Sequence, residues 1–265
     1  MSDTENELIN AINAGRIQDV KSLLGLYLGF LPDFVRCSIG FLSINCELGQ
    51  MKETPLSIAS RRGHISLVTL LINHGADVNK TDCSGQTPLF EASAFNYFSV
   101  AELLIQNGAH LNISDIHGVT PLIKASQNNH VELVNLLLRY GAEVNIRNNH
   151  GQTPLYMGSK NGNVSIVSSL LQKGADVNLA DNDGSTPLLC ASWYKHVPVV
   201  NILIEYGADV NQPGLWGKTP LHYAAGHGNE QLLYLLIQHG ADVNKMDISG
   251  ETPLSDASYY NHKKF

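Results

Sequence analysis

The tripeptide Thr-Pro-Leu begins at seven positions of this sequence, and every interval between neighbouring copies is 33 residues. The seven positions are Thr54, Thr87, Thr120, Thr153, Thr186, Thr219 and Thr252. Chance does not produce such spacing, and a fixed period of about 20–50 residues is typical of repeat architectures. We therefore expect six complete repeats over residues 54–251 and a truncated seventh repeat over residues 252–265.

Each repeat reads as two short helices. Thr54 is a good N-cap, and Pro55 follows at the first helical position, where its missing N–H has no cost. Gly63 favours a tight left-handed turn, and apolar residues at helical spacing over 65–72 predict a second helix that ends before Gly75. The later residues equivalent to Gly63 are Asn96, Asn129, Gly162, Lys195, Gly228 and Asn261. Lys195 departs from the Gly/Asn preference, so we expect its turn to be slightly strained.

The rest of the repeat predicts an extended arm that ends in a tight turn. Residues 76–79 form the arm, and an Asp-x-x-Gly turn follows from Asp82 to Gly85. One repeat cannot bury its apolar stripe alone, whereas stacked neighbours can. The predicted fold class is therefore an all-α repeat solenoid with projecting hairpin-like turns.

Three segments carry a family resemblance: Thr-Pro-Leu-His-Tyr-Ala-Ala at 219–225, Gly228-Asn229, and Gly-Ala-Asp-Val-Asn at 240–244. With the 33-residue period, these residues resemble the ankyrin repeat over three quarters of the chain. Two departures are local. The histidine after Thr-Pro-Leu occurs only as His222, and Gln212–Gly217 replaces the usual turn of its repeat. The resemblance implies a helix–turn–helix stack that binds a protein partner on its concave face and turn tips.

Residues 1–53 are less regular, and we interpret them as a capping repeat that lacks Thr-Pro-Leu. Residues 7–24 read as a helix pair, and Ile44-Asn45 stands where other repeats have Val-Asn. An apolar insert over 25–43 separates the two segments. The insert is compatible with packing on the first repeat, with a contact surface, and with an artefact of the gene model.

Composition excludes several classes of protein. The net charge is -7 and no long basic run occurs, so we expect no nucleic-acid partner. The most apolar stretch is interrupted by Pro32-Asp33 and Arg36, so we expect no membrane insertion. The N-terminus is acidic and the four cysteines lie far apart, which indicates reduced thiols in the cytoplasm, with the nucleus as the other compartment.

No constellation of residues points to catalysis, a metal or a cofactor. Most of the eleven histidines fall at repeated structural places, and no H-E-x-x-H occurs. Gly217-Lys218-Thr219 matches the end of a phosphate-binding loop, but Gln212 stands where that loop needs glycine. We expect a non-enzymatic protein.

The candidate functional residues are those that the resemblance places at the end of the first helix and at the turn tips. Trp, Tyr and Arg are frequent interface anchors, and both tryptophans belong to this set. The candidates are Arg61, Arg62, Phe95, Ile116, His117, His150, Trp193, Tyr194, Leu215, Trp216, His227, Tyr259 and Tyr260. We expect Trp193, Tyr194 and Trp216 to form one patch, although Trp193 packing against its neighbouring repeat is an alternative interpretation.

Further expectations concern modification, assembly and role. The resemblance implies β-hydroxylation by an oxygen-dependent dioxygenase at Asn79, Asn112, Asn145, Asn178, Asn211 and Asn244. The C-terminal end carries Tyr259, Tyr260 and Phe265 where a polar cap is usual, so it is expected to self-associate or to bind a missing segment. The favoured role is an interaction scaffold, and the alternative is an adaptor subunit, for example of a ubiquitin ligase.

Overall fold

The structure is a computed structural model that describes residues 2–25 and 42–260, which form two compact units. The first unit, Met1–Glu143, contains α1 (Asp3–Asn13), α2 (Ile17–Leu23), α4 (Pro55–Arg61), α5 (Ile65–Asn73), α6 (Pro88–Ala94), α7 (Phe98–Gln106), α8 (Pro121–Gln127) and α9 (Val131–Arg139). The second unit, Val144–Phe265, contains α10 (Pro154–Asn161), α11 (Val164–Gln172), α12 (Pro187–Trp193), α13 (Val197–Glu205), the 3-10 turn η2 (Leu215–Gly217), α14 (Pro220–Gly226), α15 (Glu230–Gln238) and α16 (Pro253–Tyr259).

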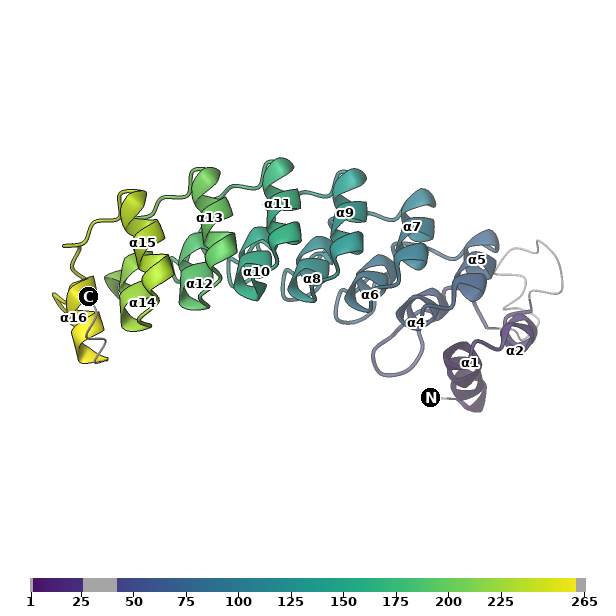
Figure 1. Cartoon of the computed structure of the whole chain (residues 1–265). Helices are drawn as coiled ribbons and strands as arrows, with labels where there is room; N and C mark the ends of the chain where they lie inside the picture. The colour runs from purple at the N-terminus through teal and green to yellow at the C-terminus, as the bar shows by residue number, and fades with distance from the viewer. Residues whose placement is uncertain (1, 26–41, 261–265) are drawn as a thin grey trace. The chain divides into compact units, whose positions relative to one another are not determined.

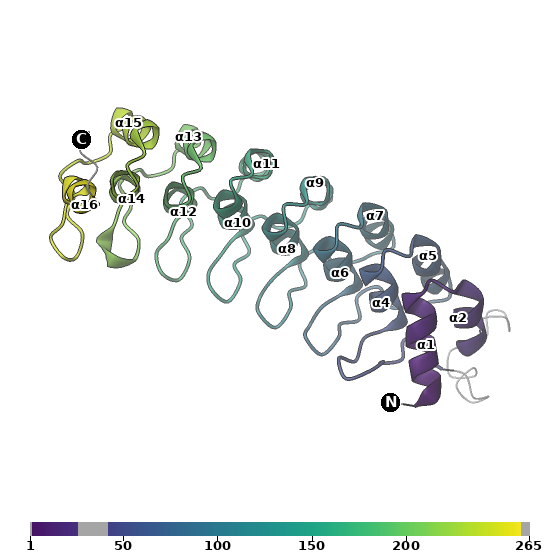
Figure 2. The same ribbon diagram turned by 60° about the horizontal axis from the view of Figure 1, so that its bottom comes forward.

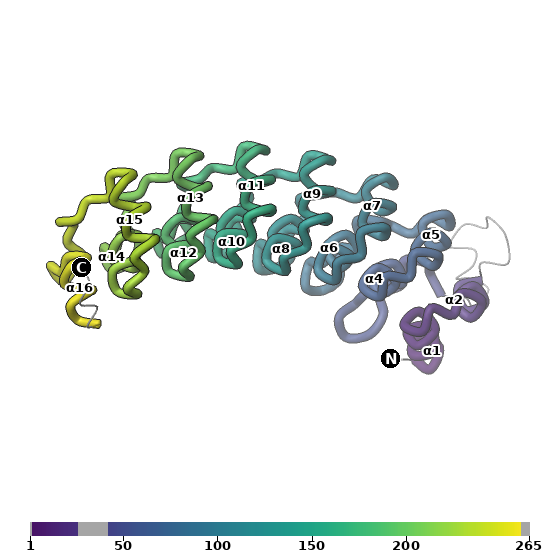
Figure 3. The backbone as a smooth tube through the Cα atoms, viewed as in Figure 1, coloured from purple at the N-terminus to yellow at the C-terminus, as the bar shows by residue number. Residues whose placement is uncertain are grey.

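Within each unit the helices form two rows (Figures 1 and 2). In the first unit α4, α6 and α8 contact one another in sequence, and α5, α7 and α9 form the second row. In the second unit α10, α12, α14 and α16 form one row, and α11, α13 and α15 form the other. The backbone trace shows the same two-helix path recurring within each unit (Figure 3). The predicted all-α repeat solenoid is confirmed.

The Thr-Pro-Leu tripeptide starts each first helix as expected. Thr54 has extended backbone, and its Oγ1 accepts a hydrogen bond from the Ser57 N–H at 3.0 Å. Pro55 occupies the first turn, and Leu56 is fully buried. The leucine of the tripeptide is at most 2% exposed at Leu56, Leu89, Leu122, Leu155, Leu188 and Leu221. The tripeptide therefore combines a helix cap with a core residue.

The predicted left-handed turn after the first helix is confirmed in all six repeats that the structure describes there. The residues with positive φ are Gly63, Asn96, Asn129, Gly162, Lys195 and Gly228, with φ between 62° and 71°. Lys195 has φ 64°, although a side chain with a Cβ costs about 1–2 kcal/mol in this conformation. Asn261 lies outside the described residues.

From Asn45 to Asn211, an asparagine side chain bonds each repeat to the next. Asn79 Oδ1 accepts from the His110 N–H at 2.8 Å, and its Nδ2 donates to the Gly108 carbonyl at 3.1 Å. Asn178 makes the same pair of bonds with the next repeat of the second unit. Asn45 Oδ1 accepts from the Asp77 N–H at 2.8 Å, which confirms that Asn45 occupies the asparagine position of the first, irregular repeat.

The predicted Asp-x-x-Gly turns form as expected and project from the first helices (Figure 2). Asp82 Oδ1 accepts from the Ser84 and Gln86 N–H groups at 2.9 and 2.8 Å, which closes the turn. Single backbone bonds connect neighbouring turns, such as the Ile116 N–H to the Ser84 carbonyl at 2.9 Å. Within the described residues the β-structure is limited to one isolated bridge, between Leu48 and Glu53.

The N-terminal helix pair is confirmed, but its first helix starts earlier than residue 7. Ser2 caps α1, because its side chain accepts from the Glu5 N–H while the Glu5 carboxylate accepts from the Ser2 N–H. This capping box explains the start at Asp3. Most of the predicted insert over 25–43 lies outside the described residues. Across residues 2–25 and 42–260, the helices are too short or too polar for a membrane crossing.

The left-handed turn generates a paired prediction. Gly162→Val should lower the free energy of unfolding by at least about 1–2 kcal/mol, because a Cβ is unfavourable at φ 71° and would stand 2.5 Å from the His196 ring. Lys195→Gly should raise that free energy by about 1 kcal/mol, because glycine has no Cβ to strain. Urea unfolding followed by tryptophan fluorescence measures both, and a loss of stability for Lys195→Gly would contradict the account.

Candidate partner-binding site

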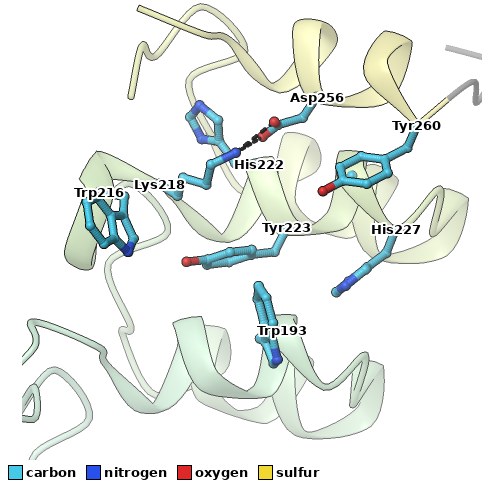
Figure 4. A pocket seen from close by; sticks show the side chains of 9 residues that line it. Trp193, Trp216, Lys218, His222, Tyr223, His227, Asp256 and Tyr260 are labelled. Carbon is cyan, nitrogen blue, oxygen red and sulfur yellow. Dashed lines mark hydrogen bonds and ion pairs between the residues drawn. The ribbon is translucent and has the colours of Figure 1, made fainter. Parts of the chain in front are cut away.

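A pocket of about 460 Å³ lies in the second unit, between the ends of three first helices and one turn tip (Figure 4). The lining residues are Trp193 at the end of α12, Trp216 in η2, Lys218, His222, Tyr223 and Gly226 on or before α14, His227 just after it, Asp256 on α16 and Tyr260 just after α16. The pocket thus collects side chains from three successive repeats. Its volume falls in the range of small-ligand or side-chain pockets.

Trp193 forms one aromatic wall of the pocket. Its ring meets the Tyr223 ring edge to face, with centroids 4.9 Å apart and planes at 86°, and it meets the His227 ring at 5.7 Å. Trp193 nevertheless remains 50% exposed. The residue therefore packs against the neighbouring repeat, as the alternative interpretation expected, and also presents half of its surface to solvent.

Trp216 reaches the pocket through an unusual turn. In the other repeats a side-chain oxygen at the first turn position accepts from the backbone N–H two residues later, as Asp247 Oδ1 does for Ser249. Gly214 stands at this position and has no side chain to accept such a bond. Trp216 adopts φ 71° and ψ 5°, an outlier for a bulky residue that costs about 1–3 kcal/mol. Its ring is 62% exposed.

Charged groups form the remaining wall. Lys218 Nζ donates to both oxygens of Asp256, at 2.7 Å each, and lies 3.7 Å from Asp247 Oδ2. Partial burial pulls the pKa of Lys218 down, but its hydrogen bonds to Asp256 and the two carboxylate charges outweigh that effect and raise the pKa above its ordinary value. Lys218 therefore stays protonated and is held by two carboxylates.

His222 supports the pocket through backbone hydrogen bonds. Its Nδ1 accepts from the Thr219 N–H at 3.1 Å, so this nitrogen carries no proton. Its Nε2 lies 3.1 Å from the Glu251 carbonyl and donates to it. The ring is therefore held in place by backbone groups, which is the structural role that the sequence indicated for most of the histidines.

The other candidate residues lie outside this pocket lining. Tyr194 stacks on His196 at 6.1 Å between ring centroids, so the pocket unites Trp193 with Trp216 but not with Tyr194. Tyr259 is 83% exposed and meets Tyr260 edge to face at 5.1 Å. The exposed candidates elsewhere are Arg62, Phe95, Ile116, His117, His150 and Leu215.

Arg61 lies in a charged cluster that sequence reasoning missed. Its guanidinium pairs with Glu53 and lies 3.8 Å from Glu91 Oε1. Carboxylate oxygens of Glu53, Asp82 and Glu91 lie within 4.8 Å of one another. Glu91 is only 4% exposed, and burial is the main reason that its pKa rises from 4.5 to about 7. The guanidinium contacts two of these three carboxylates, so the cluster is a structural ion-pair network.

Sequence reasoning also missed Tyr223 and Asp256 as pocket residues. Both occupy the fifth position counted from the threonine of their repeat, one repeat apart, and this position faces the row of first helices. A comparison of that position across repeats finds one aromatic residue, Tyr223, whereas a charged residue there is not distinctive, because Glu91 and Lys124 occupy it in two other repeats. Lys218 was noticed only for its resemblance to a phosphate-binding loop.

Comparisons with known proteins agree with this architecture. A family profile described as "Ankyrin repeats (3 copies)" matches residues 8–115, 122–214 and 211–265. The chain therefore belongs to the ankyrin repeat family, whose repeats generally mediate protein–protein interaction and are typically non-enzymatic.

Two solved structures resemble the chain. The human ASB11 ankyrin repeat domain is 32% identical, with a TM-score of 0.70, and the match covers 77% of this chain and 92% of that domain. The ankyrin repeat domain of Bcl-3, a member of the IkappaB protein family, is 30% identical, with a TM-score of 0.69 and coverage of 77% and 94%. The comparison with curated protein sequences found no match.

The buried Glu91 generates a pH prediction. Its pKa is higher in the folded chain than in the unfolded chain, so its favourable contribution is present below pH 4.5 and is lost as the pH rises towards 7. Glu91→Gln should therefore stabilise the chain at pH 8, by at most about 3 kcal/mol, and should flatten the stability profile between pH 5 and pH 8.

Urea unfolding at a series of pH values measures this effect, with Glu132→Gln, at an exposed glutamate of α9, as the matched control. The control profile should follow that of the wild type. If the profile of Glu91→Gln also ran parallel to wild type, Glu91 would be ionised in the folded chain throughout this pH range.

Proposed function

We propose that the chain is a non-enzymatic interaction scaffold that binds a protein partner through the pocket of the second unit and the adjoining turn tips. The observation that carries the proposal is the exposure of both tryptophans, Trp193 at 50% and Trp216 at 62%, in one pocket. Large exposed aromatic residues that gather in one hollow are typical of binding hot spots.

The backbone at Trp216 supports this proposal. Glycine would satisfy the left-handed conformation at no steric cost, whereas tryptophan is unfavourable there. A strained backbone that presents an exposed aromatic ring is not explained by folding, and such strain is commonly found at functional sites. We attribute the presence of tryptophan at position 216 to contact with a partner.

From the composition and the family we also propose that the protein is located in the cytoplasm or the nucleus. We propose that it binds no cofactor, no nucleic acid and no membrane. The negative net charge supports the absence of nucleic acid. Arg61 and Arg62 and the exposed candidates of the first unit are proposed as further partner contacts.

The asparagines of the repeat remain proposed β-hydroxylation sites. In the described structure the side chains of Asn79, Asn112, Asn145, Asn178 and Asn211 each bond to the following repeat. Asn244 is exposed, and its side chain has no hydrogen bond within the part of the chain that the structure describes. Asn244 is therefore the most accessible of the six to an enzyme.

A second surface supports self-association of the chain. Leu254, Ile237 and Val243 line an apolar pocket of about 360 Å³ beside α16 and are 60%, 48% and 46% exposed. The leucines equivalent to Leu254 in the six preceding repeats are at most 2% exposed, and in each of those repeats the first helix contacts the second helix. Within the described residues no helix follows α16, and we propose that a second copy of the chain covers this surface.

The tryptophans generate a test of partner binding. Trp216→Gly should weaken partner affinity by roughly 2 kcal/mol or more while leaving the thermal midpoint unchanged or higher, because it removes the ring and relieves the backbone. Trp193→Ala should weaken binding by a similar amount and cost about 0.5–1.5 kcal/mol of stability, because it removes the ring pair with Tyr223.

Affinity capture from a lysate, followed by quantitative mass spectrometry and by binding measurements on the recovered partner, provides the readout. Tyr206→Ala removes an exposed aromatic residue outside the pocket and is the matched control. Equal capture by all variants would contradict the proposal. Recovery of ubiquitin-ligase subunits independently of the tryptophans would favour the adaptor hypothesis.

The apolar surface beside α16 generates a test of self-association. Wild type should form dimers as its concentration rises, and Leu254→Asp should remain monomeric because it places a charge in the apolar pocket. Sedimentation velocity measures both states. Ile116→Asp changes an equally exposed residue, 61% against 60%, in the other unit and should behave like wild type. A wild type that stays monomeric at high concentration would contradict self-association.

A further inference from the structure

The charged side chains that line the aromatic pocket are already paired with each other. Lys218 Nζ donates to both carboxylate oxygens of Asp256, at 2.7 Å each. Of the two histidines in the lining, His222 bonds to backbone groups through both ring nitrogens, and the His227 ring meets the Trp193 ring at 5.7 Å. A charged group from a partner would lose hydration here without gaining a counter-ion of its own, which is unfavourable. The pocket therefore favours an uncharged ligand.

The remaining polar groups of the lining are able to donate hydrogen bonds. Within residues 2–25 and 42–260, the indole N–H groups of Trp193 and Trp216 make no hydrogen bond. The same holds for the hydroxyls of Tyr223 and Tyr260 in that part of the chain. An indole nitrogen can only donate, and a phenol hydroxyl can donate as well as accept. A ligand that offers acceptors and few donors therefore matches these groups best.

The aromatic rings of the pocket are spread over three successive repeats. Trp193 ends α12, Tyr223 belongs to α14 and Tyr260 follows α16, and α14 contacts both α12 and α16. The turn before α14 supplies Trp216, which lies with Tyr260 on opposite sides of the Tyr223 ring (Figure 4). Packed helices lie about 8–10 Å apart, and three residues of a polyproline II helix advance by about 9 Å. Side chains three residues apart in such a segment can therefore reach rings of neighbouring repeats.

We infer that this pocket binds a proline-rich segment of the protein partner, in polyproline II conformation and with prolines three residues apart. Proline has no backbone N–H, so such a segment offers carbonyl acceptors and few donors. Its pyrrolidine rings are apolar and uncharged, and aromatic grooves are common receptors of this conformation. The segment is also preformed, so binding costs little conformational entropy. The inference rests on the proposed function, because it names the partner chemistry that the scaffold recognises.

Two other ligand chemistries fit the pocket less well. A charged side chain, of either sign, would have to compete for the bonds that Lys218 and Asp256 make with each other. An extended aliphatic segment has suitable apolar bulk, but it brings one N–H for each residue to a lining that already has donors in excess. The missing N–H groups therefore separate proline from an aliphatic residue of similar size.

Peptide titration tests the inference directly. The chain contains two tryptophans and both line this pocket, so intrinsic tryptophan fluorescence reports on the pocket alone. The probe is acetyl-Gly-Pro-Ala-Ala-Pro-Ala-Ala-Pro-Gly-amide. In three matched peptides valine, arginine or glutamate replaces every proline, and a fourth, acetyl-Gly-Pro-Ala-Pro-Ala-Pro-Ala-Ala-Gly-amide, keeps the composition and changes the spacing.

We expect a saturable fluorescence change with the probe peptide. Binding of the valine peptide should be about tenfold weaker, because valine restores the N–H groups and lacks the preformed conformation. The peptide with altered spacing should bind about threefold weaker, because fewer of its prolines reach a ring. The arginine and glutamate peptides should bind no more tightly than the valine peptide, because neither gains a counter-ion.

A variant of the chain tests the contribution of the hydroxyl donors. The double variant Tyr223→Phe/Tyr260→Phe removes both hydroxyls and keeps both rings, including the ring pair of Tyr223 with Trp193. It should weaken binding of the probe peptide by about three- to tenfold, because it removes two hydrogen bonds to peptide carbonyls. Its urea midpoint should stay unchanged. Tyr194→Phe/Tyr206→Phe removes two hydroxyls outside the pocket lining and should bind like wild type.

Each contrary outcome has a distinct meaning. Equal or tighter binding of any matched peptide, no binding of the probe peptide, or unchanged binding by the Tyr223→Phe/Tyr260→Phe variant would overturn the inference. Any of these results leaves the proposed function standing if partner capture still depends on Trp193 and Trp216. Capture that is independent of both tryptophans would instead remove the proposed function itself.

Discussion

The fixed contact between one repeat and the next is the constraint on which the structure depends. An asparagine side chain accepts a backbone N–H of the following repeat and donates to a carbonyl two residues earlier in that repeat, as Asn79 does with His110 and Gly108. The leucine of Thr-Pro-Leu is buried in the six complete repeats. The asparagine contact recurs at each position from Asn45 to Asn211, and the period stays at 33 residues from Thr54 to Thr252. The insert over residues 25–43 comes before Asn45, the first asparagine of this series, so it does not change the spacing of the later repeats.

This constraint also determines which positions are free to vary. The side chains at the tip of the turn and at the last residue of the first helix change from repeat to repeat, although Arg61 and Trp193 also contact the next repeat. In the second unit Gly214 removes the side-chain oxygen that closes the other turns, and the backbone at Trp216 becomes left-handed. The bond from the Ile248 N–H to the Trp216 carbonyl, at 3.0 Å, is retained. The turn therefore presents a new side chain while its connection to the next repeat persists.

The sequence predicts the elements of this fold well, because each is determined by residues that lie close together in the chain. The threonine caps, the left-handed turns and the position of Asn45 are all confirmed. The start of α1 was missed although Ser2 and Glu5 form a local capping box. The pairs Lys218–Asp256 and Arg61–Glu91 were missed for a different reason. Their partners are 38 and 30 residues apart, and only the stacking of repeats brings them together.

The central claim is that the residues that contact the partner gather in the pocket of the second unit, apart from the asparagines that bond one repeat to the next. Hydrogen–deuterium exchange of the chain, alone and bound to the partner that co-purifies with it, tests this claim most directly. We predict that binding slows exchange in the turn around Trp216, in α14 and in α16, and leaves α11, α13 and α15 unchanged. A footprint confined to those second helices, or to residues 1–143, would contradict the account.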